Sequence, residues 1–162
     1  MSRAVLSLGS NLGDRLLHLT DAVATLGESV CAVSSVYRTP PWGPVAQDDY
    51  YNLALIAQAV GVDAYGWLDR CRALEQAAGR VRDIRWGPRT LDADVIVVDD
   101  VVSADPDLVL PHPRAHERAF VLLPWAEIEP DAELAGFGPI ADLLAGLDSS
   151  EITEISVVGH VG

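Results

Sequence analysis

Residues 4–27, AVLSLGSNLGDRLLHLTDAVATLG, contain the alternation that decides the fold. The apolar run at 4–8 predicts a strand, and the glycine-containing segment from Gly9 to Gly13 predicts a turn. Leucine and valine then recur at helical spacing from about Asp14 to Leu26, and Gly27 is placed to end that helix. A strand, a short turn and an amphipathic helix form the first half of a βαβ unit.

The next part of the chain repeats this pattern. Further apolar runs predict strands at 30–37, 53–60 and 93–98. A second helix is expected over 64–78, where Asp63 can cap the start and Gly79 can end the last turn. The resulting order is βαββαβ, and two βαβ units can pack both helices on one face of a four-stranded sheet. We therefore expect an α+β fold with a ferredoxin-like βαββαβ core.

The last third of the chain predicts an addition to that core. We expect a helix near 115–127, a short helix near 139–146 and a strand at 152–158. These additional C-terminal helices and the strand would cover the other face of the sheet and complete a three-layer αβα sandwich. A chain of 162 residues has the size of one domain, so we expect residues 1–162 to form a single domain.

The charge is strongly acidic, and its positive part is concentrated. The chain has 24 acidic side chains against 11 basic ones, a formal net charge of −13, which argues against nucleic acid as a partner. All the basic side chains are arginine, and six of the 11 fall within residues 70–89. Such clustering favours a compact anionic ligand. A solvated helix face would explain Arg70 and Arg72, but glycine and proline interrupt any helix over 79–89.

No segment indicates a membrane span or a secretion signal. The apolar runs fall well short of the roughly 20 residues that cross a bilayer. The N-terminus lacks the long apolar centre and the cleavage site of a signal peptide. Cys31 and Cys71 have neither the number expected of a disulfide framework nor the spacing of a metal site. We therefore expect a cytoplasmic protein with no membrane partner.

Two connections are longer than simple turns. Residues 38–50 contain three prolines, and residues 79–91 are comparably irregular. Connections of this length are often lids or binding loops. Because each of them adjoins an expected strand, we expect both to rim the same end of the sheet.

Asp92 and Asp94 mark the start of the strand expected at 93–98. Side chains two apart on a strand point to the same face, so these carboxylates would lie side by side and repel each other. A divalent cation would relieve the repulsion, and oxygen ligands favour magnesium. On this motif alone, a solvated strand end is the simpler interpretation. However, four arginines within 80–89 directly precede the pair, and phosphoryl transfer needs both metal ligands and fixed positive charge.

Two further side chains are candidates for a phosphate site. Glu75 lies on the apolar face of the second helix, near its C-terminal end, where negative charge is disfavoured. An arginine or a ligand donor beside it would relieve that charge, although a solvated position at the edge of the face is equally consistent. His112 stands between two prolines, so it is either a phosphate donor or a structural turn residue.

Several motifs in order resemble the 6-hydroxymethyl-7,8-dihydropterin pyrophosphokinase family of folate biosynthesis. The resemblance covers the chain from Gly9 to about Pro130. Its segments are GSNLGDR at 9–15, YRTPPWGP at 37–44, YYN at 50–52, GRVRDIRWGPRTLDADV at 79–95 and LPHPRAHERAFVLLPW at 110–125. It implies an ATP- and Mg²⁺-dependent diphosphotransferase that moves the β,γ-pyrophosphoryl group of ATP to the pterin hydroxymethyl group and releases AMP. ATP would be a co-substrate.

The resemblance also implies roles around the phosphates. Asp92 and Asp94 would bind two Mg²⁺ ions that bridge the ATP phosphates. Arg80 and Arg89 would stabilise the charge that develops on the transferred group. The residues implied at the ATP site are Glu75, Arg82, Trp86, Arg89, Val95, His112 and Arg118.

For the acceptor, the resemblance implies a pterin ring held between Tyr50 and Phe120. Asn52 would bind the polar edge of the ring, since an amide offers both a donor and an acceptor. The other residues implied at the pterin site are Thr39, Pro40, Trp42 and Trp86. Core packing is the alternative for the two aromatic rings, but Asn52 beside Tyr50 favours the pocket. The substrates are small molecules, and we expect a monomer.

Two other functions fit the expected fold. A small-molecule sensor domain can have a ferredoxin-like sheet, but it would have no use for arginines next to paired carboxylates. A different Mg²⁺-dependent nucleotidyl or phosphoryl transferase would share the phosphate residues. The segments resembling a pterin site, within 37–52, distinguish the pyrophosphokinase from that second alternative.

Overall fold

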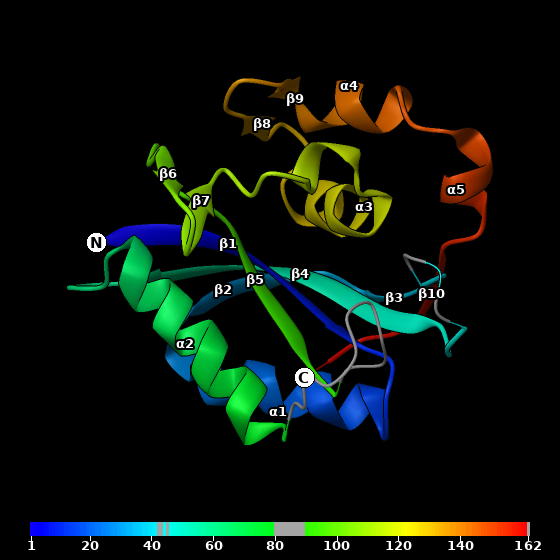
Figure 1. The fold of residues 1–162 in the computed structure, drawn as a ribbon, viewed down its shortest axis with the longest axis horizontal. Coiled ribbons are helices and arrows are strands. Elements are labelled where there is room, and N and C mark those ends of the chain that lie inside the picture. Colours follow the sequence, from blue (N-terminus) through cyan, green and yellow to red (C-terminus); the bar gives the residue numbers. More distant parts are fainter. Residues whose placement is uncertain (42–43, 45, 80–89, 162) are drawn as a thin grey trace.

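One antiparallel sheet organises the computed structural model, which describes residues 1–41, 44, 46–79 and 90–161. Its central strands are β1 (Ser2–Ser10) and β4 (Tyr50–Ala59), which pair along their whole length. On the other side of β1 lies β5 (Asp92–Val98). On the other side of β4 lie β2 (Val30–Val33) and β3 (Val36–Thr39), and β10 (Ser156–Gly159) pairs with β3 at the edge. The predicted ferredoxin-like core is confirmed (Figure 1).

Helices cover both faces of this sheet, in three layers. Figure 1 shows α1 (Arg15–Leu26) and α2 (Ala64–Ala77) on one face and α3 (Ala119–Ile128) on the other. Side chains alternate along each strand, so every strand contributes apolar side chains to both faces of the sheet. Along β1, Leu6 and Leu8 pack toward α1 and α2, whereas Val5 belongs to the cluster on the α3 side.

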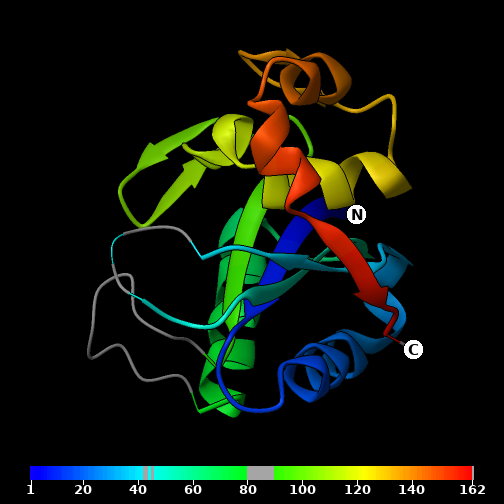
Figure 2. The ribbon, with the colours of Figure 1, turned by 90° about the vertical axis from the view of Figure 1, so that its right-hand side faces the viewer.

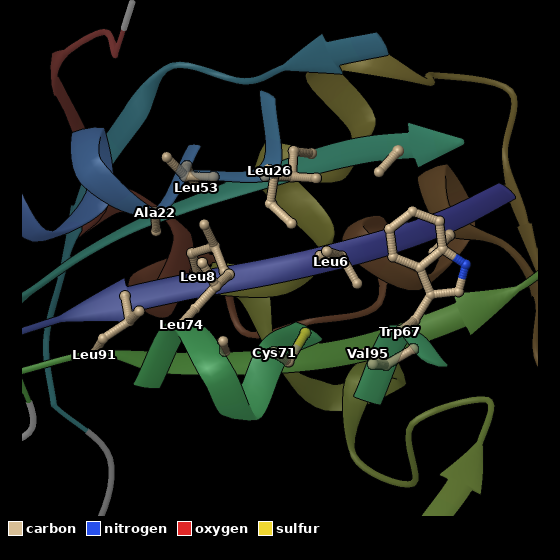
Figure 3. Close-up of a cluster of buried hydrophobic side chains, with 14 of the residues drawn as sticks. Leu6, Leu8, Ala22, Leu26, Leu53, Trp67, Cys71, Leu74, Leu91 and Val95 are labelled. Carbon is tan, nitrogen blue, oxygen red and sulfur yellow. The ribbon is translucent and has the colours of Figure 1, made fainter. Parts of the chain in front are cut away.

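The cluster between the sheet and the helices α1 and α2 is the larger part of the core. Figure 3 shows Leu26 of α1 and Trp67, Cys71 and Leu74 of α2 along Leu6 and Leu8 of β1. All six are at most 8% exposed. This apolar burial fixes both helices on the sheet, and therefore fixes the strand ends that carry the candidate site.

The predicted helix starts and stops agree with the structure. The side chain of Asp14 accepts from the backbone N–H of Leu17 at 3.1 Å. Asp63 caps α2 in the same way, through the N–H of Gly66 at 2.8 Å. Gly27 ends α1 with φ of +56°, a conformation that glycine adopts without strain.

Two expected segments are divided differently. The strand expected at 30–37 is broken into β2 and β3, because Ser34 and Ser35 lie between them. The Ser34 hydroxyl donates to the Ser35 carbonyl at 2.8 Å and accepts from the N–H of Ala54 at 2.9 Å, while the Ser34 N–H donates to the Ala54 carbonyl at 2.9 Å. A side-chain acceptor thus replaces a backbone acceptor at the break. The turn expected from Gly9 is shorter, because Gly9 and Ser10 belong to β1.

The last third keeps the expected helices but adds hairpins. The helix expected at 115–127 begins as η2 (Ala115–Glu117), changes direction at the extended Arg118 and continues as α3. The short helix is α4 (Ile140–Ala145). The strand expected at 152–158 is partly wrong, because α5 (Ser149–Thr153), capped by Asp148, precedes β10. Figure 2 shows this return to the sheet edge.

Four short strands and a short helical turn were not predicted. They are β6 (Ser103–Asp105), β7 (Leu108–Leu110), β8 (Glu133–Leu134), β9 (Gly138–Pro139) and the 3₁₀ turn η1 (Gly27–Ser29). The four strands form two separate hairpins. In the described part of the chain, no helix combines the length and the apolar character that a bilayer span needs.

Leu19→Ala should lower the free energy of unfolding by about 3 kcal/mol, because it leaves a cavity under β1. Leu19 is 0% exposed, whereas Leu17 in the same helix is 51% exposed. Leu17→Ala is the matched control and should change stability by no more than about 0.5 kcal/mol. Urea titrations of both variants measure the difference. Equal losses would contradict the packing of α1 described here.

Candidate active site

A row of side chains crosses the sheet on the face that α3 covers. Directly paired residues of an antiparallel sheet point to the same face. Gly9 of β1 pairs with Asn52 on one side and with Asp92 on the other, and Asn52 pairs in turn with Tyr37. Asp94 lies two residues after Asp92 and shares its face. The structure therefore brings the predicted metal ligands and the predicted pterin residue Asn52 onto one surface.

The β3 and β4 end of this row combines aromatic and polar groups. Thr39 pairs with Tyr50, so both belong to the same face as Asn52. The Asn52 amide Nδ2 donates to the Thr39 hydroxyl at 2.5 Å, and both residues are at most 4% exposed. Pro40 follows at the end of β3 and is half-buried. Four of the predicted pterin-site residues are thus contiguous.

Gly9 lies in the middle of this row, although the sequence interpretation assigned it to a turn. A Cβ atom at Gly9 would lie 2.4 Å from Oδ1 of Asn52 and 3.3 Å from the ring of Tyr50. The missing side chain is therefore what allows the Asn52 carboxamide to lie across β1. The only signal in the sequence was a glycine directly after an apolar strand, which more often indicates a turn.

The opposite end of the row carries the two carboxylates. Asp92 and Asp94 are half-buried on β5, and their β1 partners are Gly9 and Ser7. β1 therefore presents only small residues between the carboxylates and Asn52. The described residues contain no cluster of three or more potential metal ligands. A pair of carboxylates nevertheless fits magnesium, which commonly takes one or two protein carboxylates and completes its shell with substrate phosphates and water.

His112 lies near the carboxylates as a neutral side chain. Its backbone N–H donates to the Ile96 carbonyl at 2.8 Å, and its Nδ1 accepts from the N–H of Arg114 at 3.2 Å. Burial and then the nearby charge of Arg118 lower the pKa of His112 to about 4, although Asp92 opposes the shift. Because Nδ1 is an acceptor, the proton of the neutral ring is assigned to Nε2, which leaves Nε2–H as a donor.

Arg118 brings a cation to the same place. It is the extended residue before α3, and its guanidinium carbon lies 5.4 Å from the centroid of the Phe120 ring. Burial lowers the pKa of Arg118, and the charges of Asp94 and Asp92 counteract that shift. An arginine remains protonated under such conditions. The first turn of α3 therefore places the cation Arg118 and the aromatic Phe120 next to each other.

Glu75 is buried under the opposite face of the sheet. It is 6% exposed, and its Oε2 accepts from the backbone N–H of Ala93 at 3.1 Å. Ala93 lies between the two aspartates, so α2 holds the β5 backbone where both carboxylates emerge. Burial, followed by the charges of Asp94 and Glu75, raises the pKa of the Cys71 thiol, which keeps that neighbour uncharged.

Val95, which the resemblance implied at the ATP site, does not present its side chain on the face of the two aspartates. It pairs with Leu6, is 5% exposed and belongs to the cluster under α1 and α2. Its side chain therefore packs into the core. The remaining predicted residues lie outside the described part of the chain, and they are Trp42, Arg80, Arg82, Trp86 and Arg89.

The turn after β1 makes hydrogen bonds to the segment before Tyr50. The sequence interpretation did not predict this contact. The Asn11 amide Nδ2 donates to Gln47 Oε1 at 2.7 Å and to the Asp48 carbonyl at 2.9 Å. The Arg15 guanidinium donates to the Asp49 carbonyl at 2.8 Å, and its carbon lies 4.0 Å from the centroid of the Tyr51 ring. The GSNLGDR segment was the available signal, since it places these polar side chains directly after a strand.

Sequence comparison identifies the relatives of this chain. The family model described as 7,8-dihydro-6-hydroxymethylpterin-pyrophosphokinase (HPPK) matches residues 5–130. The 2-amino-4-hydroxy-6-hydroxymethyldihydropteridine pyrophosphokinase of Mycobacterium leprae is 49% identical, with 93% of this chain and 86% of the relative covered. The enzyme of the same name from Methylorubrum extorquens is 46% identical, with 96% and 99% covered.

Solved structures support the fold at lower identity. The HPPK-DHPS triple mutant of Plasmodium falciparum, in a structure with pteroate, superposes with a TM-score of 0.73 at 13% identity. That match covers 96% of this chain but only 46% of the Plasmodium chain, so this chain spans less than half of that protein. With the family model over residues 5–130 and relatives of 46–49% identity, this chain belongs to the 7,8-dihydro-6-hydroxymethylpterin-pyrophosphokinase family.

Proposed function

We propose that this protein transfers the β,γ-pyrophosphoryl group of ATP to the hydroxymethyl group of 6-hydroxymethyl-7,8-dihydropterin and releases AMP, a step of folate biosynthesis. The observation that carries the proposal is the row across β4, β1 and β5. It sets the Asn52 amide and the Asp92 and Asp94 carboxylates on one face, with only Gly9 and Ser7 of β1 between them. This arrangement supports an acceptor site and a phosphate site next to each other.

The pterin ring would occupy the β4 end of the row. Tyr50 and Phe120 supply flat aromatic surfaces on which a heterocycle can stack. Asn52 commits one amide hydrogen to Thr39, which leaves Oδ1 and the second hydrogen for the polar edge of the pterin. Thr39 and Pro40 border this place on β3, and the family resemblance adds Trp42 and Trp86.

The ATP phosphates would lie at the β5 end. Asp92 and Asp94 would hold two Mg²⁺ ions, which when bound neutralise phosphate charge during the transfer. Neutral His112 would donate through Nε2–H, and Arg118 would contribute fixed positive charge to the same oxygens. Glu75 would act indirectly, by holding the β5 backbone at Ala93. Val95 would contribute main-chain atoms, because its side chain packs in the core. The resemblance adds Arg80, Arg82, Trp86 and Arg89.

The chain itself would act by holding two substrates in line. The pterin hydroxyl oxygen attacks the β-phosphorus, the bond from that phosphorus to the α,β-bridging oxygen breaks, and AMP leaves with that oxygen. The hydroxyl proton passes to solvent or to a phosphate oxygen, so no protein nucleophile is needed. Positioning and preorganised charge then supply the rate enhancement.

The proposal extends to the state of the protein. Residues 1–162 would act as one domain and as a monomer in the cytoplasm. The free thiols of Cys31, which is exposed, and Cys71, which is buried, are consistent with a reducing compartment.

The decisive experiment follows the nucleotide product. The protein is incubated with ATP, Mg²⁺ and 6-hydroxymethyl-7,8-dihydropterin, and the nucleotides are separated over time. We expect AMP to appear in step with the pyrophosphorylated pterin, and none without the pterin. Formation of ADP in place of AMP, or no turnover, would contradict the proposed reaction.

A further inference from the structure

We propose that Glu127 is a positioning residue for the pterin half of the site, a role that rests on the proposed function. Glu127 lies near the C-terminal end of α3. Its Oε2 accepts from the backbone N–H of Ser35 at 2.9 Å and from the Ser35 hydroxyl at 3.3 Å. Its Oε1 accepts from the hydroxyl of Tyr37. One carboxylate thus joins α3 to the beginning of β3.

The donors of these hydrogen bonds are buried on the strand side, whereas Glu127 itself is exposed. Ser35 is 7% exposed and Tyr37 is 8% exposed. Burial, and then the hydrogen bond to Glu127, raises the pKa of the Tyr37 hydroxyl, which therefore remains a donor. Burial opposes ionisation of Glu127, but the hydrogen bonds from Tyr37 and Ser35 lower its pKa overall. A charged acceptor with neutral donors makes hydrogen bonds stronger than neutral pairs make.

On the strand side, this anchor is adjacent to the polar wall of the site. Tyr37 is the direct partner of Asn52 and lies two residues before Thr39 on the same face. Thr39 is the residue that accepts from the Asn52 amide. β3 resumes at Val36, immediately after the break at Ser34 and Ser35, and Glu127 binds the chain at that break. The carboxylate therefore helps to set where β3, and with it Thr39, meets β4.

On the helix side, the same anchor is linked to the aromatic wall. Phe120 lies seven residues before Glu127, about two helical turns, so both point to the same side of α3. Over β3 and β4, α3 also packs through the apolar side chains of Val121, Leu122 and Trp125, and such packing does not depend strongly on direction. The directional hydrogen bonds that Glu127 accepts would fix the rotation of α3 over β3 and β4, and thereby the separation of Phe120 from Tyr50.

Glu129 offers a matched control at the same end of the helix. It follows α3 directly, accepts from the Trp125 indole N–H at 2.9 Å and pairs with Arg3. It therefore also tethers the helix to the sheet through a carboxylate. Its partner strand is β1, near the end remote from Gly9, so Glu129 has no link to β3. Replacing either glutamate with glutamine removes one charge and keeps the size.

The test compares substrate dependence in Glu127→Gln, Tyr37→Phe and Glu129→Gln. We expect Glu127→Gln to raise the KM for the pterin by about tenfold, since a neutral amide is a weaker acceptor than the carboxylate for the donors of Ser35 and Tyr37. The KM for ATP should change by less than about twofold. Tyr37→Phe should shift the pterin KM in the same direction but less, and the double variant should resemble Glu127→Gln because the two groups form one network.

Four outcomes separate the possibilities. An active wild type with an unchanged pterin KM in Glu127→Gln and in Tyr37→Phe overturns the positioning role alone. Equal rises of the pterin KM in Glu127→Gln and Glu129→Gln also overturn it, because they would reflect general loosening of α3. If Glu127→Gln does not fold, Tyr37→Phe decides, since it removes one hydroxyl. A wild type that forms no AMP overturns the proposed function and, with it, this inference.

Discussion

Asp94→Ala should reduce the rate of AMP formation by about a thousandfold or more. Asp94 is half-buried beside Asp92 on β5, facing the surface where the phosphates would lie. Removing one of two carboxylates would weaken the hold on magnesium, and metal charge stabilises such a transfer by several kcal/mol. Initial rates at saturating ATP, pterin and Mg²⁺ measure the loss. Pterin binding should survive in the presence of a non-hydrolysable ATP analogue, because Thr39, Asn52 and Phe120, which we propose for the pterin, lie on β3, β4 and α3.

Asp100→Ala is the control for that experiment. Asp100 is exposed and follows the far end of the same strand. Its replacement removes the same charge from the protein but changes no residue of the row across β4, β1 and β5. The rate should therefore stay within about twofold of the wild type. Near-normal activity of Asp94→Ala would contradict the magnesium role proposed for the pair. Loss of pterin binding in that variant would instead indicate a wider structural change.

Gly9→Ala should raise the KM for the pterin by about tenfold to a hundredfold. The new methyl group would lie 2.4 Å from Oδ1 of Asn52, far inside the contact distance. β1 is paired on both sides at this residue, with Asn52 and with Asp92, so the strand is poorly able to move away. The Asn52 carboxamide must rotate, which breaks its bond to Thr39, and overpacking of this kind costs about 1–3 kcal/mol.

A second strand glycine provides the comparison. A Cβ atom at Gly159 of β10 would have no heavy atom within 4 Å. Gly159→Ala adds the same methyl group to the same sheet and should leave both KM values within about twofold of the wild type. Isothermal titration with pterin and an ATP analogue gives the affinities directly. A wild-type pterin affinity in Gly9→Ala would contradict the placement of Asn52 across β1.

Local patterns explain why the βαββαβ order was predictable. Leu19 and Leu26 recur at helical spacing, and Asp14 and Asp63 occupy cap positions, all within short stretches of chain. The break between β2 and β3 was not predictable, because it depends on Ser34 bonding to Ala54, a residue of another strand. The same holds for the short hairpins, which have too few residues to show a period.

The candidate site likewise has features that local patterns predict and features that depend on contacts between distant strands. A period of two residues was enough to predict that Asp92 and Asp94 share a face. The position of the Asn52 side chain over Gly9 depends on the register between β1 and β4, and no local pattern specifies that register. Glu75 was recognised as an unusual inward carboxylate, but its described partner is the backbone N–H of Ala93, which carries no side-chain signal. The family resemblance supplied what spacing lacked, namely the pterin.

β10 has a consequence for how this protein behaves in concentrated solution. β10 covers one side of β3 and itself forms this edge of the sheet, as a strand of 4 residues whose register shifts between Val157 and Gly159. Open edges are templates for unwanted strand addition between molecules. The segment after residue 130, which the family model does not match, thus replaces β3 at the edge with a short, irregular strand, and such a strand disfavours self-association.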